Sequence, residues 1–181
     1  MELKGTRQIA ADRATVWAAL NDPEVLKASI PGCSSLTGSP EEGFEAVVTQ
    51  KVGPVKATFK GVVRLTDVVA GESYTIAGEG KGGAAGFAKG AADVRLADAE
   101  LDGAPGTQLD YDVRASVGGK IAQLGSRLID GFAKKMADTF FENFKAQVEG
   151  PGEAPEAAPD VPSAQAEKKP GWVGRMVGRK A

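Results

Sequence analysis

The hydrophobic period changes once along the chain, and this change limits the folds that the chain can adopt. Apolar and polar side chains alternate between residues 43 and 117, clearly so over residues 107–117. After residue 119, apolar side chains recur every four residues, at Leu124, Leu128, Phe132, Met136, Phe140, Phe144 and Val148. Alternation is typical of antiparallel strands with one wet face, and a four-residue repeat is typical of an amphipathic helix. The two patterns predict an α+β fold in which a helix spanning 119–149 packs on a sheet.

Shorter signals predict the remaining elements. Residues 2–9 are typical of a first strand, and Asp12 and Asp22 are suited to cap two short helices that follow it. Pro23 suits the first position of the second helix. Five strand-like runs come next, over residues 43–52, 55–69, 73–81, 88–97 and 107–117. We therefore expect a curved antiparallel sheet, two short helices after the first strand, and one long C-terminal helix.

Small side chains at inward strand positions predict a cavity between the sheet and the long helix. Examples are Ala46, Ala57, Gly61, Ala92 and Ala115. Apolar pockets form commonly between such layers, and a fully packed core is the alternative.

Composition excludes several classes of chemistry. The chain of 181 residues has no histidine and one cysteine, Cys33. Zinc sites built from cysteine and histidine, Ser-His-Asp triads and histidine-ligated haem are therefore excluded. Asp110 and Asp112 share a strand face, but it is the polar face, where a solvated carboxylate is the better interpretation. We expect no catalytic residue and no metal site, and hence a protein that is not an enzyme.

A glycine-rich stretch at residues 78–90 contains the spacing Gly78-x-Gly80-x-x-Gly83. A dinucleotide site needs that spacing between a strand and a helix whose N-terminus holds phosphate. Strand-like residues stand on both sides here, and no helix signal follows. Bends and close approaches in a curved sheet are the better interpretation.

Charge and composition divide the chain into three segments. Residues 1–149 carry the periodic pattern and form the predicted domain, residues 150–168 are a Pro/Ala/Glu-rich linker expected to be disordered, and residues 169–181 are a basic tail. Residues 1–166 carry a net charge of −6 and residues 167–181 one of +4. An acidic body argues against nucleic-acid binding. No signal peptide or membrane-spanning run is visible, so we expect a cytoplasmic location.

The tail combines positive charge with an apolar helical side that includes a tryptophan. Such a segment is typical of contact with an anionic membrane surface, here the inner face of the cytoplasmic membrane. The predicted membrane-binding residues are Lys168, Lys169, Trp172, Val173, Arg175, Met176, Val177, Arg179 and Lys180. A docking peptide for a partner protein and a disordered tail are the alternatives.

The domain resembles the CoxG-like family, the G-subunit family of carbon monoxide dehydrogenase. The resemblance rests on the opening MELKGTRQIAADRATVWAALNDPEVLKASIPGC, on VGPVKATFKGVVRL and GEGKGGAAGFAKGAADVRL, and on GTQLDYDVRASVGGKIAQLGSRLIDGFAKKM with the following FFENFK. It implies a helix-grip fold of the START/Bet v 1-like (SRPBCC) superfamily, in which a curved sheet wraps around the long helix and leaves a deep apolar cavity. It also implies a non-catalytic accessory role beside a CO dehydrogenase-type molybdenum hydroxylase, in membrane attachment or electron delivery.

Three functional hypotheses follow from these observations. In the first, the domain binds a hydrophobic small molecule, a membrane quinone or lipid, non-covalently and without a covalent cofactor. Its predicted ligand-binding walls are Phe59, Val63, Tyr74, Ile76, Tyr111, Val113, Leu124, Leu128, Phe132 and Met136. A hydrogen bond from Tyr74 or Tyr111 to a quinone oxygen is part of this hypothesis. The second is a ligand-free membrane anchor or assembly factor for the same enzyme. The third, a small hydrolase or cyclase, lacks an inward acid or base.

Overall fold

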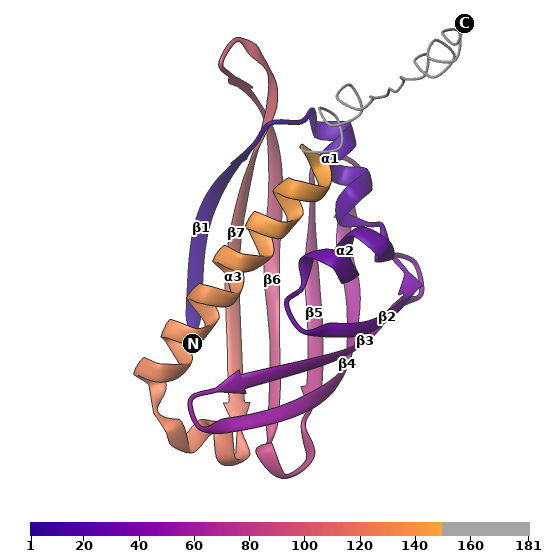
Figure 1. Ribbon diagram of the computed structural model, residues 1–181. Helices are drawn as coiled ribbons and strands as arrows, with labels where there is room; N and C mark the ends of the chain where they lie inside the picture. Colours follow the sequence, from indigo (N-terminus) through magenta and orange to yellow (C-terminus); the bar gives the residue numbers. More distant parts are fainter. Residues whose placement is uncertain (150–181) are drawn as a thin grey trace, which may run out of the picture. The chain divides into compact units, whose positions relative to one another are not determined.

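The computed structural model describes residues 1–149, which contain one sheet, three α-helices and two 3-10 helices (Figure 1). The strands are β1 (Glu2–Ile9), β2 (Cys33–Ser39), β3 (Gly43–Val52), β4 (Val55–Val69), β5 (Ser73–Lys81), β6 (Phe87–Leu101) and β7 (Ala104–Gly118). The helices are α1 (Arg13–Leu20), α2 (Pro23–Ser29) and α3 (Ser126–Val148), with 3-10 helices η1 (Gly83–Ala85) and η2 (Gly119–Leu124). The order of elements agrees with the α+β prediction.

All seven strands form one antiparallel sheet in the order β1-β7-β6-β5-β4-β3-β2. The sheet curves around α3, which runs diagonally across its concave face, while α2 packs beside β2 and α1 lies against β6 and β7 (Figure 1). This is the predicted helix-grip arrangement. It arises because alternation gives each strand one apolar side, and the concave side receives the apolar stripe of the helix.

Side-chain caps set the positions of the two short helices. The Asp12 carboxylate accepts a hydrogen bond from the Thr15 backbone N–H, and the Asp22 carboxylate accepts one from the Glu24 N–H, with Pro23 at the first helical position. The helix α2 is then fixed to α3, because the Asn143 side chain donates to the Ser29 carbonyl at 3.1 Å. These contacts hold α2 beside the long helix as part of the wall around the interior.

The long helix begins later than the sequence pattern predicts. Gly125 has a φ of +95°, which ends the 3-10 helix η2 before α3 starts at Ser126. Residues 119–124, predicted as the first turns of one helix over 119–149, form this separate element. The observed α3 has 23 residues and is about 35 Å long. A hydrophobic period of four continues through a break of this kind, since periodicity reports which side is apolar and not whether the backbone is continuous.

Two strand predictions also change. β2 is not among the predicted runs, because Ser34, Ser35 and Gly38 give it little alternation. β6 and β7 extend beyond the predicted 88–97 and 107–117 to meet in a hairpin where Leu101 pairs with Ala104. The glycine-rich stretch forms the end of β5, the short η1 and the start of β6. Within the described residues, no α-helix follows this stretch before α3. A dinucleotide site needs a helix directly after the glycines, so the interpretation as a bend in the sheet is the one that agrees with the structure.

The main core lies where α1 and the C-terminal half of α3 meet the sheet. Its fully buried members are Ile9, Val16, Leu109 and Phe144. The predicted linker 150–168 and tail 169–181, with all nine predicted membrane-binding residues, lie outside the described residues. Within residues 1–149, no helix is long and apolar enough to cross a bilayer.

Candidate functional site

An apolar cavity of about 390 Å³ lies between the concave face of the sheet and the helices. Its walls come from α1 and α2, from strands β2 to β7, and from the middle of α3. The lining residues are Leu20, Leu26, Ile30, Pro31, Leu36, Phe44, Ala46, Val63, Leu65, Tyr74, Ile76, Ala92, Val94, Leu109, Tyr111, Val113, Met136, Ala137, Phe140 and Phe141. A cavity of this size and character is typical of a small-molecule site.

The cavity has a simple origin in residue size. Ala46 on β3 and Ala92 on β6 face the interior, and Ala137 faces them from α3. Larger side chains, among them Phe44 and Phe140, line the rest of the cavity, and the short side chains of the alanines leave space between them. The small inward side chains of the sequence predict a cavity of this origin between these two layers.

Six of the ten predicted ligand-binding residues line this cavity. They are Val63, Tyr74, Ile76, Tyr111, Val113 and Met136. They come from the three strands β4, β5 and β7 and from α3, and the structure brings them together around one space. That they contact a ligand remains a prediction.

The other four predicted residues, Phe59, Leu124, Leu128 and Phe132, are absent from the cavity lining. Leu124 and Leu128 approach Gly53 in the β3–β4 turn, where a Cβ atom would lie 2.8 Å from Leu128. The Phe59 ring lies against Gly82 in the same way. The predicted helix over 119–149 places Leu124, Leu128 and Phe132 in one stripe with Met136. The break at Gly125 separates Leu124 from α3. Leu128 and Phe132 lie on α3 itself, on the two turns before Met136, and Leu128 is 41% exposed.

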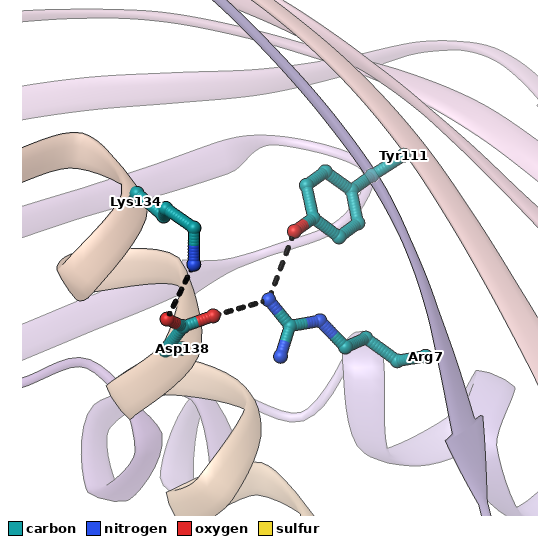
Figure 2. Close-up of polar contacts among 4 residues, drawn as sticks. All are labelled: Arg7, Tyr111, Lys134 and Asp138. Atoms are coloured by element: carbon teal, nitrogen blue, oxygen red, sulfur yellow. Dashed lines mark hydrogen bonds and ion pairs between the residues drawn. The ribbon is translucent and has the colours of Figure 1, made fainter. Parts of the chain in front are cut away.

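Four polar side chains, shown in Figure 2, form a cluster around the hydroxyl of the cavity residue Tyr111. Arg7 of β1 donates from one nitrogen, Nη2, to the Asp138 carboxylate at 2.6 Å and to the Tyr111 hydroxyl at 3.0 Å. Lys134, one turn before Asp138 on α3, donates to the same carboxylate at 3.2 Å. We call Arg7, Tyr111, Lys134 and Asp138 the Arg7 cluster. It ties the edge strand β1 to α3.

Aromatic rings complete the setting of the Arg7 cluster. The guanidinium carbon of Arg7 lies 5.0 Å from the centre of the Phe141 ring, and Phe141 stacks on Tyr111 with ring centres 5.2 Å apart. A cation over aromatic faces is attracted to their π-electrons. The cavity wall formed by Tyr111 and Phe141 is thus held by a charged group.

Arg7 and Asp138 each favour the charged form of the other. Burial acts to lower the pKa of Arg7, but its hydrogen bonds to Asp138 and Tyr111 outweigh burial and raise that pKa. The hydrogen bond from Arg7, and after it the one from Lys134, lowers the pKa of Asp138. Both groups are therefore charged over the whole physiological pH range.

Sequence reasoning missed Arg7 and Asp138, although a signal for Arg7 was present. Within the first strand, Arg7 shares its face with Leu3 and Ile9, so the alternation already places a charge on the apolar side. Such an inward charge needs a partner. Its partner Asp138 lies 131 residues along the chain, and no local pattern connects the two.

Tyr74, the second tyrosine that lines the cavity, has a different environment from Tyr111. Tyr74 is 4% exposed and contacts Trp17 of α1 edge-to-face at 5.4 Å between ring centres. Burial raises the pKa of Tyr74 far above its ordinary value. Among residues 1–149, its hydroxyl has no hydrogen-bond partner. Buried polar groups are nearly always paired, so an unpaired hydroxyl beside a cavity indicates a position for a ligand atom or a water.

The chemistry available in the cavity is that of binding. Of the described residues that line it, only Tyr74 and Tyr111 bring a hydroxyl, and none brings a charged group. Within the described residues, no group of three or more Cys, Asp or Glu side chains is placed to hold a metal ion. Asp110 and Asp112 lie on the convex face, where Thr6 and Lys4 contact them, as the polar-face interpretation expects.

Comparison with solved structures identifies the fold. A conserved protein from Geobacillus kaustophilus superposes with a TM-score of 0.75 at 29% identity, covering 83% of this chain and 96% of that one. A START superfamily protein from Mycobacterium smegmatis gives 0.60 at 15% identity, covering 82% and 97%. A protein from Thermus thermophilus gives 0.57 at 14% identity, covering 83% and 99%. The fold is START-like.

Comparison with curated proteins finds no match. A family model does match, however, and it covers residues 5–149, from within β1 to the end of α3, with every residue that lines the cavity. Because this match covers most of the sequence, the chain belongs to the CoxG family, the G-subunit family of carbon monoxide dehydrogenase.

Proposed function

We propose that this protein is a non-catalytic accessory protein of a CO dehydrogenase or related molybdenum hydroxylase, and that it carries a membrane quinone in its cavity for electron delivery. The family assignment supports the link to CO dehydrogenase. The observation that carries the proposal is the apolar cavity, whose lining of twenty residues includes no charged side chain. Apolar walls with two hydroxyl groups suit an apolar ring that bears carbonyl oxygens.

When bound, a quinone supplies the redox chemistry, and the residues of this chain hold and shield it. The aliphatic side chains of Val63, Ile76 and Val113 form the floor on the sheet, and Met136 covers them from α3. Met is flexible and adapts to ligands of different shape. These residues exclude water from the ring without reacting with it.

Tyr74 is the better candidate to contact a ligand oxygen. The Tyr111 hydroxyl already accepts from Arg7, whereas the Tyr74 hydroxyl has no partner within the described residues. A ligand carbonyl that accepts the Tyr74 proton removes the cost of burying that hydroxyl alone. Loss of the cavity's water then strengthens the same hydrogen bond, because the surroundings are apolar.

The tail, outside the described residues, completes the proposal. Its basic residues and Trp172 are suited to the anionic inner surface of the cytoplasmic membrane, where quinones dissolve. The protein would then be peripheral, exchanging its ligand with the bilayer beside the partner enzyme.

A pair of neighbouring alanines tests the cavity. Ala92 faces the interior and pairs with Ile76 and Val113, while Ala91 faces outward and pairs with Ala77 and Arg114. Ala92→Trp fills the cavity, and Ala91→Trp adds the same side chain on the other face. We expect quinone, measured by mass spectrometry after solvent extraction of the purified full chain, in wild type and Ala91→Trp and not in Ala92→Trp.

Uptake from quinone-loaded vesicles is the second measurement. A wild-type protein that is isolated empty and takes up no quinone would contradict the proposal and favour the ligand-free anchor. The same conclusion follows if Ala92→Trp supports CO-dependent respiration in the cell as well as Ala91→Trp does.

A further inference from the structure

The sheet has one strongly basic end. It comprises residues 51–60 at the β3–β4 turn, residues 79–89 at the β5–β6 turn, and residues 116–130 around η2 and the start of α3. These segments meet in space at the lower end of Figure 1, where Gly119 packs on Gly86 and Leu128 on Gly53. The basic end carries Lys51, Lys56, Lys60, Lys81, Lys89, Lys120 and Arg127, all exposed, against only Glu79 and Asp130.

The opposite end of the sheet has the reverse charge. The β4–β5 and β6–β7 turns carry Asp67, Glu72, Asp98, Glu100 and Asp102. The mild net charge of the chain, −2, therefore conceals a polarity along the strands. This polarity is a property of the folded domain and is separate from the charge of the tail.

The cations of the basic end are not used to stabilise the fold. None of the seven takes part in an ion pair within the described residues. Two pairs of them, Lys51 with Lys56 and Lys60 with Lys81, stand directly opposite each other on adjacent strands. Like charges in that position destabilise a sheet. An external anion that contacts both members of each pair would relieve this repulsion.

Exposed apolar side chains lie among these cations. Phe87 is 43% exposed and pairs with Lys81, with Lys89 two residues further along its own strand. Leu128, 41% exposed, stands next to Arg127 at the start of α3. The Phe87 ring lies over Gly118 of β7 and keeps an exposed side. Lysines around an exposed aromatic ring suit a lipid surface, since phospholipid headgroups attract the charge and the ring enters the boundary between headgroups and acyl chains.

We propose that the basic end of the folded domain docks on an anionic phospholipid surface, with Phe87 inserted and Lys60, Lys81 and Lys89 at the headgroups. This contact is additional to that of the tail. It does not depend on the cavity being occupied by quinone. Because it involves three separate segments of the fold, it fixes the orientation of the sheet on the membrane, which a single tail at the end of a linker does not do.

Vesicle sedimentation of the full chain measures the contribution of the basic end. The probe is quinone-free vesicles of phosphatidylglycerol and phosphatidylcholine, compared with phosphatidylcholine alone. The variant Lys60→Glu/Lys81→Glu replaces two positive charges that face each other on adjacent strands by two negative charges. The matched control, Lys27→Glu/Lys145→Glu, makes the same change in net charge on α2 and at the end of α3. We expect the first variant to lower the partition coefficient at least about twentyfold, since each basic residue contributes about fivefold. We expect the control to retain most of the binding.

A site-specific label locates the contact. In a Cys33→Ser background, an environment-sensitive fluorophore is attached at Phe87→Cys or, as a control, at Val68→Cys, which is 52% exposed near the acidic end. We expect a blue shift on anionic vesicles at position 87 and not at position 68. Equal binding of Lys60→Glu/Lys81→Glu and its control, or a shift at position 68 alone, would overturn the proposal. So would wild-type binding that is the same on both kinds of vesicle.

Discussion

The two sides of the cavity differ in the hydrogen bonding of a buried tyrosine. On the side of β1 and β7, the Tyr111 hydroxyl is held by Arg7, and Arg7 is held by Asp138. On the side of β5 and α1, the Tyr74 hydroxyl is as deeply buried but has no partner among the described residues. The same group therefore serves the fold in one wall and is free for a ligand in the other. Substitutions on each side separate stability from binding.

Removing Arg7 should have the largest effect. Arg7→Ala deletes both hydrogen bonds and the packing on Phe141, so we expect the free energy of unfolding to fall by about 2 kcal/mol. Chemical denaturation measures this change. Lys4→Ala on the opposite face of the same strand removes an exposed ion pair with Asp112 and should cost less than about 0.5 kcal/mol. Equal losses in the two variants would show that the Arg7 cluster is not a structural clamp.

Removing the hydroxyl of Tyr111, in the Arg7 cluster, should have the next largest effect. Tyr111→Phe leaves the Arg7 nitrogen with one acceptor fewer, and we expect a loss of about 1 kcal/mol in unfolding free energy. Quinone affinity should change little, because the Tyr111 hydroxyl is turned to Arg7. A large loss of affinity with unchanged stability would reverse the roles that we assign to the two walls.

The tyrosine on the other side should show the opposite behaviour. Tyr74→Phe removes a hydroxyl that has no partner within residues 1–149, so stability should stay within about 0.5 kcal/mol of wild type or rise. Quinone affinity, measured by fluorescence or extraction equilibrium, should fall about fivefold, the value of one hydrogen bond. If affinity is unchanged while the cavity still fills, the ligand makes no contact with this hydroxyl.

The smallest expected effect is a pH dependence of the stability that the Arg7 cluster contributes through Asp138. The pKa of Asp138 is lowered in the folded chain, first by Arg7 and then by Lys134. A carboxylate of this kind stabilises the fold above its unfolded pKa, and the stabilisation is lost as pH falls through the folded pKa. The difference in thermal unfolding midpoint between wild type and Asp138→Asn should therefore be greatest near neutral pH and shrink in acid. A difference that stays constant to about pH 2 would contradict the assignment.

Much of the fold could be predicted from local pattern, and the reasons for the failures are physical. Strands β3 to β7 follow from alternation, and α1 and α2 from Asp12, Asp22 and Pro23. Leu124 is not on the same helix as Met136, as the period predicts, because Gly125 at positive φ separates η2 from α3 while the apolar period continues. The five strand residues among the six predicted residues that line the cavity share the inward face, which alternation reveals, and Met136 lies on the apolar stripe of α3. The pairing of Arg7 with Asp138 depends on how α3 crosses the sheet, and no single segment encodes that angle.

The pairing of the first strand with the last has a consequence for synthesis on the ribosome. β1 bonds only to β7 within the described sheet, with Leu3 opposite Val113 and Ile9 opposite Thr107. About a hundred residues must therefore be made before β1 finds its partner, and closure of such a long loop is slow. Until then, its edge and the inward Arg7 are exposed in the nascent chain. Native assembly should thus be completed only late in translation, when β7 and α3 become available together.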